Sequence, residues 1–357
     1  MPLARAVTTV IGRDISVLLA PEAGRRQPLR GFDEDYVDIV DYIIRCTHRI
    51  WEEKRIHLIR THYSPDCILH TLAGEVCGAE AVVDNTIKTL AAFPDRTLFG
   101  DNVVWTGNDR DGFYSSHRIS SHMTNLGTSD FGSATGRRAT VTTIADCVVL
   151  ANRIVEEWLV RDNFSLVLQL GLDPHAIARE RALAARDARL TVPHTPAAAA
   201  STEAPSSWSP PDPADPSAAA CRAAADRWHA LWNDRDFSWV REVYAPTCTV
   251  WAPSGRVLFG HGEIIGWYAH LLGAIGNARL QVGHVCAVPR AAGEIDLAIR
   301  WTLDGTHTGP GLHLPPTGAP VHILGITHWH LVDGVVAEEW TVFDELAVLA
   351  QLYGGRP

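Results

Sequence analysis

Residues 333–340 read DGVVAEEW, and residues 151–158 read ANRIVEEW. Asp-Gly is a strong signal for a two-residue hairpin turn, and Ala-Asn stands in the same place in the earlier stretch. Each dipeptide is followed by a short alternating segment, which is typical of a β-strand. Both segments end in Glu-Glu-Trp. The two stretches therefore predict the same hairpin, built twice in one chain.

The similarity between the two halves extends beyond this hairpin. Further residues recur in the same order at an offset of 181 or 182 positions: Trp51 and Trp232, Tyr63 and Tyr244, Pro65 and Pro246, Cys67 and Cys248, Gly78 and Gly260, Thr135-Gly136 and Thr317-Gly318, Asp162 and Asp344, and Gln169-Leu170 and Gln351-Leu352. An ordered series at a nearly constant offset indicates a tandem duplication.

The repeats divide the chain into four segments. Residues 1–30 form an N-terminal extension, whose apolar stretch Ile15–Ala20 is either a strand or a helix docked on the first repeat. Residues 31–187 form the first domain and residues 218–357 the second. Between them, residues 188–217 are rich in Pro, Ala and Ser and lack an apolar period, so they are predicted to be a linker.

Each repeat begins with helical patterns and continues with long alternating segments. In the first repeat we predict a helix from about Asp33 and another that ends near Tyr63-Ser64-Pro65, a strand at Cys67–Thr71, a helix at Ala79–Ala92, and strands at Thr97–Trp105, Gly112–Met123, Arg138–Leu150 and Arg153–Arg161. Helices followed by antiparallel strands indicate an α+β fold. We expect two tandem cone-shaped α+β barrel domains, each with a curved antiparallel sheet wrapped on helices around a pocket.

Composition narrows the possible functions. The 357 residues suffice for two to three domains, and 46% hydrophobic with 20% charged residues excludes global disorder. The formal net charge of −10 and the lack of a Lys/Arg-rich stripe argue against a nucleic-acid partner. No apolar run approaches the ~18 residues of a membrane span, and residues 1–30 lack the pattern of a signal peptide. Seven cysteines without a Cys-x-x-Cys pair indicate neither a disulfide framework nor a zinc ribbon. We therefore expect a soluble, reduced, cytoplasmic protein.

Several motifs of the second repeat together resemble those of one protein family. They are WTLDGTHTG at 301–309, PPTG at 315–318, DGVVAEEW at 333–340 and Gln351-Leu352; the first repeat keeps Ser121-His122, Gly132, Thr135-Gly136 and Glu156-Glu157-Trp158. This set resembles the SnoaL-like polyketide cyclases, also called predicted ester cyclases, of the nuclear-transport-factor-2-like superfamily. The resemblance implies acid/base catalysis of an intramolecular aldol closure without metal or organic cofactor. It also implies a small-molecule substrate and a homodimer paired through the outer sheet faces, or an intrachain pseudo-dimer of the two repeats.

The catalytic residues of the family do not carry over. Its acid/base aspartate falls on Leu159 and Thr341, and its helper histidine on Ala145 and Thr327, none of which transfers protons at neutral pH. Glu157 lies two positions before Leu159, and Glu339 two positions before Thr341, so each glutamate is on the same strand face as the position of the family's aspartate. We therefore predict Glu157 and Glu339 as the acid or base, because an apolar cone raises the pKa of a carboxyl group. The alternative is a structural glutamate paired with Arg118 or Arg300.

Other residues complete the predicted sites. His117 shares a sheet side with Trp105 on the neighbouring strand and is expected to form a proton-transfer pair with Glu157. His122, His307, Thr327, Trp329 and Thr341 are predicted to line a pocket, with a strand-end hydrogen bond as the alternative for His307. Asp162 and Asp344 are candidate catalytic acids, although each precedes a helix and could serve as its N-cap. His328 and His330 could hold half of a metal site, but the family register places them on the outer side of the sheet.

Three classes of function remain open. The leading hypothesis is a cofactor-independent acid/base enzyme, of cyclase, isomerase, dehydratase or hydrolase type, that acts on a small apolar or carbonyl substrate. The second is a non-catalytic ligand-binding or scaffold protein that has lost the cyclase aspartate. The third is a metal-dependent activity at the histidines. Because the first repeat combines His117, Trp105 and Glu157, we expect it to hold the working site and the second repeat to act mainly as its folded partner.

Overall fold

The computed structural model describes residues 7–22, 24–191 and 217–355. These residues form two compact units. The first lies within Met1–Arg161 and Gln169–Gly171, and the second lies within Asp162–Leu168 and Leu172–Pro357. Helix α5 (Asn163–Gln169) therefore belongs mainly to the second unit, and α6 (Pro174–Thr191) belongs to it entirely. The predicted linker begins later than residue 188, because α6 continues to Thr191; residues 192–216 of that linker lie outside the described residues.

The first unit contains one six-stranded sheet in the order β2-β1-β6-β5-β4-β3. Its strands are β1 (Tyr63–Thr71), β2 (Gly74–Cys77), β3 (Thr97–Asn108), β4 (Gly112–Thr124), β5 (Arg138–Leu150) and β6 (Arg153–Arg161). β1 pairs with β6 in parallel, and the other neighbours are antiparallel. The α+β class is confirmed, but the sheet ends at β2 and β3 and is no closed barrel.

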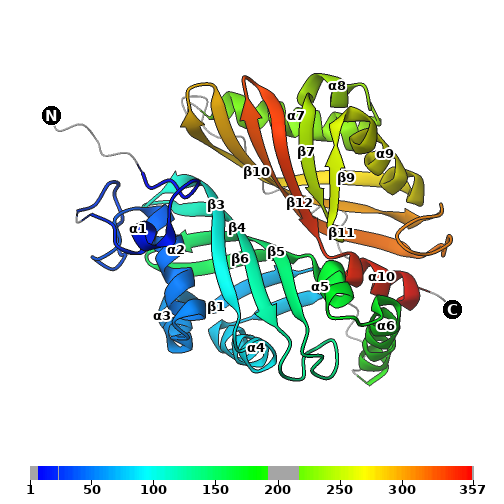
Figure 1. The fold of residues 1–357 in the computed structure, drawn as a ribbon, viewed down its shortest axis with the longest axis horizontal. Coiled ribbons are helices and arrows are strands. Elements are labelled where there is room, and N and C mark those ends of the chain that lie inside the picture. Colours follow the sequence, from blue (N-terminus) through cyan, green and yellow to red (C-terminus); the bar gives the residue numbers. More distant parts are fainter. Residues whose placement is uncertain (1–6, 23, 192–216, 356–357) are drawn as a thin grey trace. The chain divides into compact units, whose positions relative to one another are not determined.

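Helices cover one face of this sheet (Figure 1). They are α1 (Ile15–Leu19), α2 (Ile39–Thr47), a π-helix (His48–Glu52), α3 (Ile59–His62), which follows a short 3-10 turn (Ile56–Leu58), and α4 (Ala79–Ala92). Of the two structures considered for the extension, the helix is confirmed: α1 packs against α2 and buries Leu18. Asp38 caps α2 by accepting the backbone N–H of Asp41.

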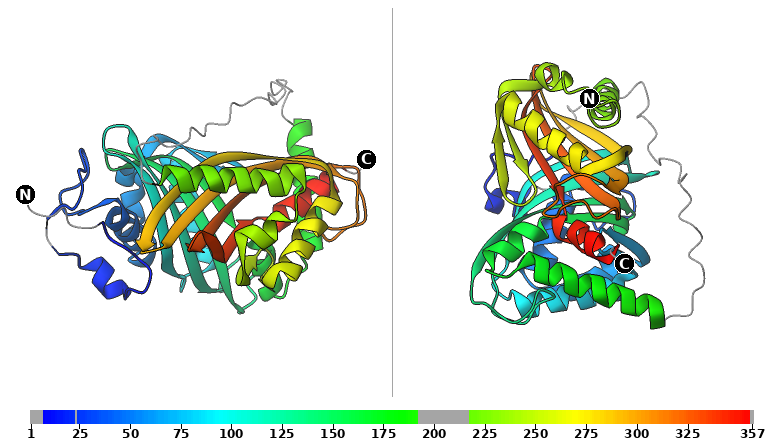
Figure 2. Two further views of the ribbon diagram at one scale, coloured as in Figure 1. Left: turned by 90° about the horizontal axis from the view of Figure 1, so that it is seen from above. Right: turned by 90° about the vertical axis from the view of Figure 1, so that its right-hand side faces the viewer.

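The second unit repeats this plan with the strand order β8-β7-β12-β11-β10-β9. Its strands are β7 (Tyr244–Ala252), β8 (Arg256–Phe259), β9 (Ile275–Ala291), β10 (Glu294–His307), β11 (Pro320–Val332) and β12 (Val335–Phe343). Its further helices are α7 (Ala218–His229), a π-helix (Ala230–Asp234), α8 (Trp239–Val243), α9 (Gly260–Ala274) and α10 (Glu345–Gly354), and α6 lies beside α10 (Figure 2). Among the described helices, none is long and apolar enough to cross a membrane.

The repeated hairpin has the geometry that its sequence predicts. Ala151 and Asn152 have φ values of 45° and 71°, and Asp333 and Gly334 have values of 50° and 84°. A two-residue turn with positive φ at both positions matches the twist of its strands. The predicted bounds of β5, β6 and α4 are confirmed. β1 begins at Tyr63, four residues earlier than predicted, with a shift in register between Tyr63 and Ile68 that accommodates Pro65.

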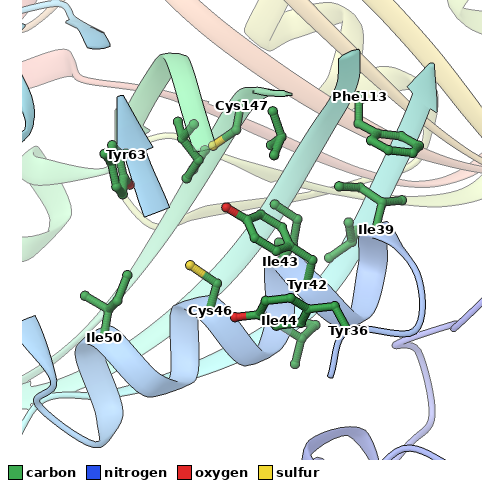
Figure 3. Packing of buried hydrophobic residues seen from close by; sticks show 14 of the residues in the cluster. Tyr36, Ile39, Tyr42, Ile43, Ile44, Cys46, Ile50, Tyr63, Phe113 and Cys147 are labelled. Atoms are coloured by element: carbon green, nitrogen blue, oxygen red, sulfur yellow. The ribbon is translucent and has the colours of Figure 1, made fainter. Parts of the chain in front are cut away.

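The core of the first unit lies between α2 and the sheet (Figure 3). The buried rings of Phe32 and Tyr36 each meet Tyr42 edge-on, with centroids 5.0 Å apart. Cys46 and Ile50 extend this cluster along the helical segment, and Cys147 faces them from β5. The inner face of the sheet, where the first candidate carboxylate lies, is therefore packed with aromatic, aliphatic and thiol side chains.

Candidate acid/base site

Glu157 lies on β6 within the apolar cluster of the first unit. The strand register places it between Cys147 of β5 and Leu69 of β1, and its exposed fraction is 7%. The Tyr63 hydroxyl donates a hydrogen bond of 2.8 Å to Oε2, and it is the only donor to this carboxylate within the described residues. Burial raises the pKa of Glu157 to about 7, against the lowering effect of the Tyr63 bond. The group can therefore both accept and release a proton near neutral pH.

Glu339 holds the equivalent position on β12 but has much denser surroundings. It is fully buried opposite Trp329 of β11. Four side chains donate to it: Tyr244 Oη at 2.5 Å, Thr341 Oγ1 at 2.6 Å, Trp329 Nε1 at 2.9 Å and Tyr268 Oη at 3.0 Å. Burial still raises the pKa of Glu339, although all four bonds lower it. Its carboxylate is the centre of a closed hydrogen-bond network.

The two repeats differ at three of these four donors. Tyr63 and Tyr244 correspond, and each donates to the glutamate of its own unit. The positions of Thr341, Trp329 and Tyr268 are taken in the first repeat by Leu159, Cys147 and Thr86. The first repeat therefore keeps the buried carboxylate and one phenol donor, and the three side chains that replace the rest of the network donate no hydrogen bond to the carboxylate.

The family model for SnoaL-like polyketide cyclases matches the chain twice, over residues 42–170 and 222–352, which together make up more than half of its length. The chain belongs to the SnoaL-like polyketide cyclase family. None of the curated proteins matches its sequence. The SnoaL-like tandem arrangement predicted from the repeat is thereby confirmed.

Solved structures that are similar to one SnoaL-like repeat include a proposed SnoaL-like polyketide cyclase from Jannaschia sp. CCS1, with 23% identity over 37% of this chain and 92% of that one and a TM-score of 0.31. AclR from Streptomyces galilaeus, a proposed hydroxylase, is 23% identical over 38% of this chain and 96% of its own, with a TM-score of 0.32. IdmH from Streptomyces antibioticus, a proposed polyketide cyclase, is 24% identical over 36% of this chain and 96% of its own, with a TM-score of 0.30.

His117 of the SnoaL-like first unit does not meet Glu157. Its cross-strand row runs through Val103, Ala145 and Leu159, whereas Glu157 shares a row with Cys147, Ser115 and Trp105. No hydrogen bond joins the two side chains, and His117 Nε2 has no partner in the described part of the chain. Burial lowers the pKa of His117 to about 3, so the imidazole is neutral. The predicted proton-transfer pair is therefore wrong, although Trp105 lies in the row of Glu157.

Two other histidines predicted to line a pocket lie elsewhere. His122 is exposed on the opposite face of β4, where its Nδ1 is 2.9 Å from Thr140 Oγ1. His307 is fully buried, and its two ring nitrogens each lie 3.1 Å from loop oxygens, Thr317 Oγ1 and the Gly311 carbonyl. Its alternative role, a hydrogen bond at the strand end, is the one that the structure supports. Neither histidine lines a pocket beside a glutamate.

The remaining substrate-binding predictions fall in the network of the second unit. Trp301 Nε1 donates to Thr327 Oγ1 at 3.1 Å, and Thr327 Oγ1 is 2.8 Å from Thr341 Oγ1. Thr327, Thr341 and Trp329 are all buried, and their polar atoms bond to each other or to Glu339. These residues therefore fill the interior of the second unit instead of facing an open pocket.

Both candidate aspartates are helix N-caps in the second unit. Asp344 Oδ1 accepts the backbone N–H groups of Leu346 and Ala347 at the start of α10. Asp162 Oδ1 accepts the N–H of Ser165 in α5, and its Oδ2 accepts the N–H of Gly255. Burial raises the pKa of Asp162 to about 6. The capping alternative accounts for both residues.

Of the two histidines considered for a metal site, His330 bonds to groups of the chain itself. His330 Nδ1 is 2.9 Å from Asp296 Oδ1, and Arg290 Nη1 lies 3.2 Å from the same ring nitrogen. Within the described residues, no group of three or more His, Cys, Asp or Glu side chains could hold a metal ion. Tyr63, Tyr244 and Tyr268 belong to the site but were not predicted from the sequence, although the repeat aligns the first two.

Proposed function

We propose that the first domain is a cofactor-independent acid/base enzyme with Glu157 as its proton-transferring group. The observation that carries this proposal is the difference between the two carboxylates, since Glu157 has one donor and Glu339 has four. A carboxylate with one donor keeps lone pairs for a substrate proton, whereas one with four has none to spare. Membership of the SnoaL-like family supports a small-molecule substrate.

The proposed chemistry is proton transfer next to a carbonyl group. Glu157 removes a proton from the α-carbon of a carbonyl compound, and the electron pair of the broken C–H bond moves into an enolate. The protonated Glu157 then returns this proton to carbon or to the leaving oxygen. A pKa of about 7 suits both halves of the cycle, because the driving force for each transfer is similar at neutral pH. Enolate formation of this kind is common to aldol cyclisation, isomerisation and dehydration.

The second domain is proposed to be a folded, non-catalytic partner. Its carboxylate is satisfied by protein donors, and its interior contains the buried rings of Trp228, Trp232, Trp301 and Trp329. This packing also favours the rival hypothesis for that half of the chain, a structural module that has kept the fold and lost the acid. The two domains would then divide catalysis and support between them.

Deuterium exchange tests the proposal without knowledge of the natural substrate. A panel of small aryl ketones and 1,3-diketones is incubated with the full chain in D₂O at pD 7, and deuterium at the α-carbon is measured by NMR. We expect enzyme-dependent exchange with at least one compound, its loss in Glu157→Gln, and its retention in the matched variant Glu339→Gln. Exchange that survives Glu157→Gln, or that Glu339→Gln alone removes, would overturn the assignment. Thermal unfolding of both variants identifies any loss caused by misfolding.

A further inference from the structure

A pocket lined by both apolar and positively charged side chains opens in the first unit between α4 and the π-helix (His48–Glu52) that follows α2. Its apolar walls include Trp51, Ile56, Leu90 and Phe93, and two cationic residues, Lys54 and Arg96, also line it. Ile50 lines the same pocket and belongs to the cluster that contains Tyr63 and Cys147 (Figure 3). The pocket therefore adjoins the apolar surroundings of Glu157.

Arg96 lacks a counter-ion in this pocket. Its buried Nε has no hydrogen-bond partner, and across the described ranges no carboxylate lies within ion-pair distance of its guanidinium. Glu52 attracts it at longer range, but this carboxylate accepts the backbone N–H of Leu98. Burial lowers the pKa of Arg96 to about 9, so the group stays charged at neutral pH. The Arg96 side chain as a whole is half-buried, so its guanidinium, with a desolvated Nε that makes no hydrogen bond, is accessible to an anion from outside the chain.

The second repeat shows that the fold does not need a guanidinium at this position. Ala278 corresponds to Arg96, and Arg235 corresponds to Lys54. Lys54 Nζ donates to the Arg96 carbonyl at 3.0 Å, and Arg235 Nη2 donates to the Ala278 carbonyl at 3.3 Å. Lys54 and Arg235 also share a left-handed backbone, with φ values of 59° and 58°. The cation at the turn is thus part of the repeated architecture, whereas the Arg96 side chain is particular to the first repeat.

We propose that this pocket binds a small organic carboxylate with a flat apolar body. The Arg96 guanidinium pairs with the carboxylate, because its planar fork matches two carboxylate oxygens. Trp51 and Phe93 contact the apolar body, as aromatic side chains do in ligand pockets. This proposal rests on the proposed function of Glu157. The substrate is then a carbonyl compound that also carries an acidic group, and Arg96 holds that group near the Glu157 carboxyl.

Fluorine NMR of the full chain tests the pocket directly. 4-Fluorobenzoate and its neutral analogue 4-fluorobenzamide are titrated at pH 7.5, and the dissociation constant of each is taken from the shift and width of its ¹⁹F signal. Because hydrogen bonds to charged groups are strong, we expect the benzoate to bind about tenfold or more tightly than the amide, and Arg96→Ala to remove this preference. Ala278 in the repeat indicates that the alanine variant will fold, and Arg96→Gln provides a second neutral variant.

Arg55→Ala is the matched control, because it removes one positive charge from an exposed side chain of the same loop. It should leave the benzoate affinity unchanged. Equal affinity for benzoate and benzamide in the unaltered protein, no benzoate binding at millimolar concentration, or equal weakening by Arg55→Ala would each overturn the proposal. Glu157→Gln should keep the benzoate site, so a failure of the catalytic assignment and a failure of the carboxylate site give different results.

Discussion

Replacing each buried glutamate by leucine should have unequal effects on stability. In Glu339→Leu, four side chains lose their acceptor: Tyr244, Tyr268, Trp329 and Thr341. The two tyrosine hydroxyls lie 3.1 Å apart and can bond to each other, and Thr341 can bond to Thr327 at 2.8 Å. Trp329 Nε1 is left without such a substitute. With about 1–3 kcal/mol for each donor that stays unpaired, and two unpaired (Trp329 Nε1 and one of the two tyrosine hydroxyls), the expected loss is about 2–6 kcal/mol.

Within the part of the chain that the structure describes, Glu157→Leu removes the acceptor of one donor, Tyr63. The cost of that unpaired hydroxyl, about 1–2 kcal/mol, is offset because the variant no longer buries a carboxyl group in an apolar cluster. The free energy of unfolding should therefore change by less than about 1 kcal/mol.

Urea unfolding of the full chain measures both variants. Since a chain of two domains need not unfold in one step, each transition is fitted by itself. Tryptophan fluorescence reports mainly on the second unit, which contains the buried Trp228, Trp232, Trp301 and Trp329, and circular dichroism reports on both. If Glu157→Leu lowers the free energy of unfolding as much as Glu339→Leu does, the first carboxylate is as important for the fold as the second, and the distinction drawn between them is refuted.

Three further predictions concern the same residues and the assembly. The pKa of Glu157 is about 7 in the folded protein, above its ordinary value of 4.5; the stability that this proton binding confers is fully present below about pH 4.5 and is lost as pH rises through about 7. Chemical unfolding between pH 5 and 8 should therefore show a decline for the first unit that Glu157→Gln lacks, and equal slopes would contradict it. Tyr63→Phe should raise the pKa of Glu157 further, because the phenol hydrogen bond lowers it; an unchanged or lower value by NMR titration would be inconsistent with that bond. Light scattering should give one chain per particle if the two repeats form an intrachain pseudo-dimer, whereas a two-chain particle would favour the homodimer.

Much of the fold could be predicted from local sequence signals. The turn residues at Ala151-Asn152 and Asp333-Gly334 need positive φ, and the alternating segments beside them define long strands. Those signals are local, so the bounds of β5, β6 and α4 followed from them. The length of α6 and its place in the second unit depend on contacts with α10, which no local pattern encodes.

The candidate site was only partly predictable. Alternation placed Glu157 on the face of Leu159 and Glu339 on the face of Thr341, because β6 and β12 are regular over these positions; the register shift in each strand lies just before them. The predicted pair of His117 and Glu157 is wrong because alternation along a strand predicts the face on which a side chain lies but not the residues opposite it on the neighbouring strands. His117 is in the row of Ala145, one row from Glu157. Tyr268 reaches Glu339 from α9, a tertiary contact that the sequence does not reveal.

The assignment of Glu157 as the proton-transferring group rests above all on its raised pKa. It can be measured by ¹³C NMR of the side-chain carboxyl carbon in glutamate-labelled protein, with the Glu157 signal assigned by its absence in Glu157→Gln. We expect a titration midpoint near pH 7 for Glu157, and the Glu339 signal is assigned separately by its absence in Glu339→Gln. A Glu157 midpoint near 4.5, the ordinary value for an exposed glutamate, would contradict the central claim that the first unit holds a proton-transferring carboxyl group.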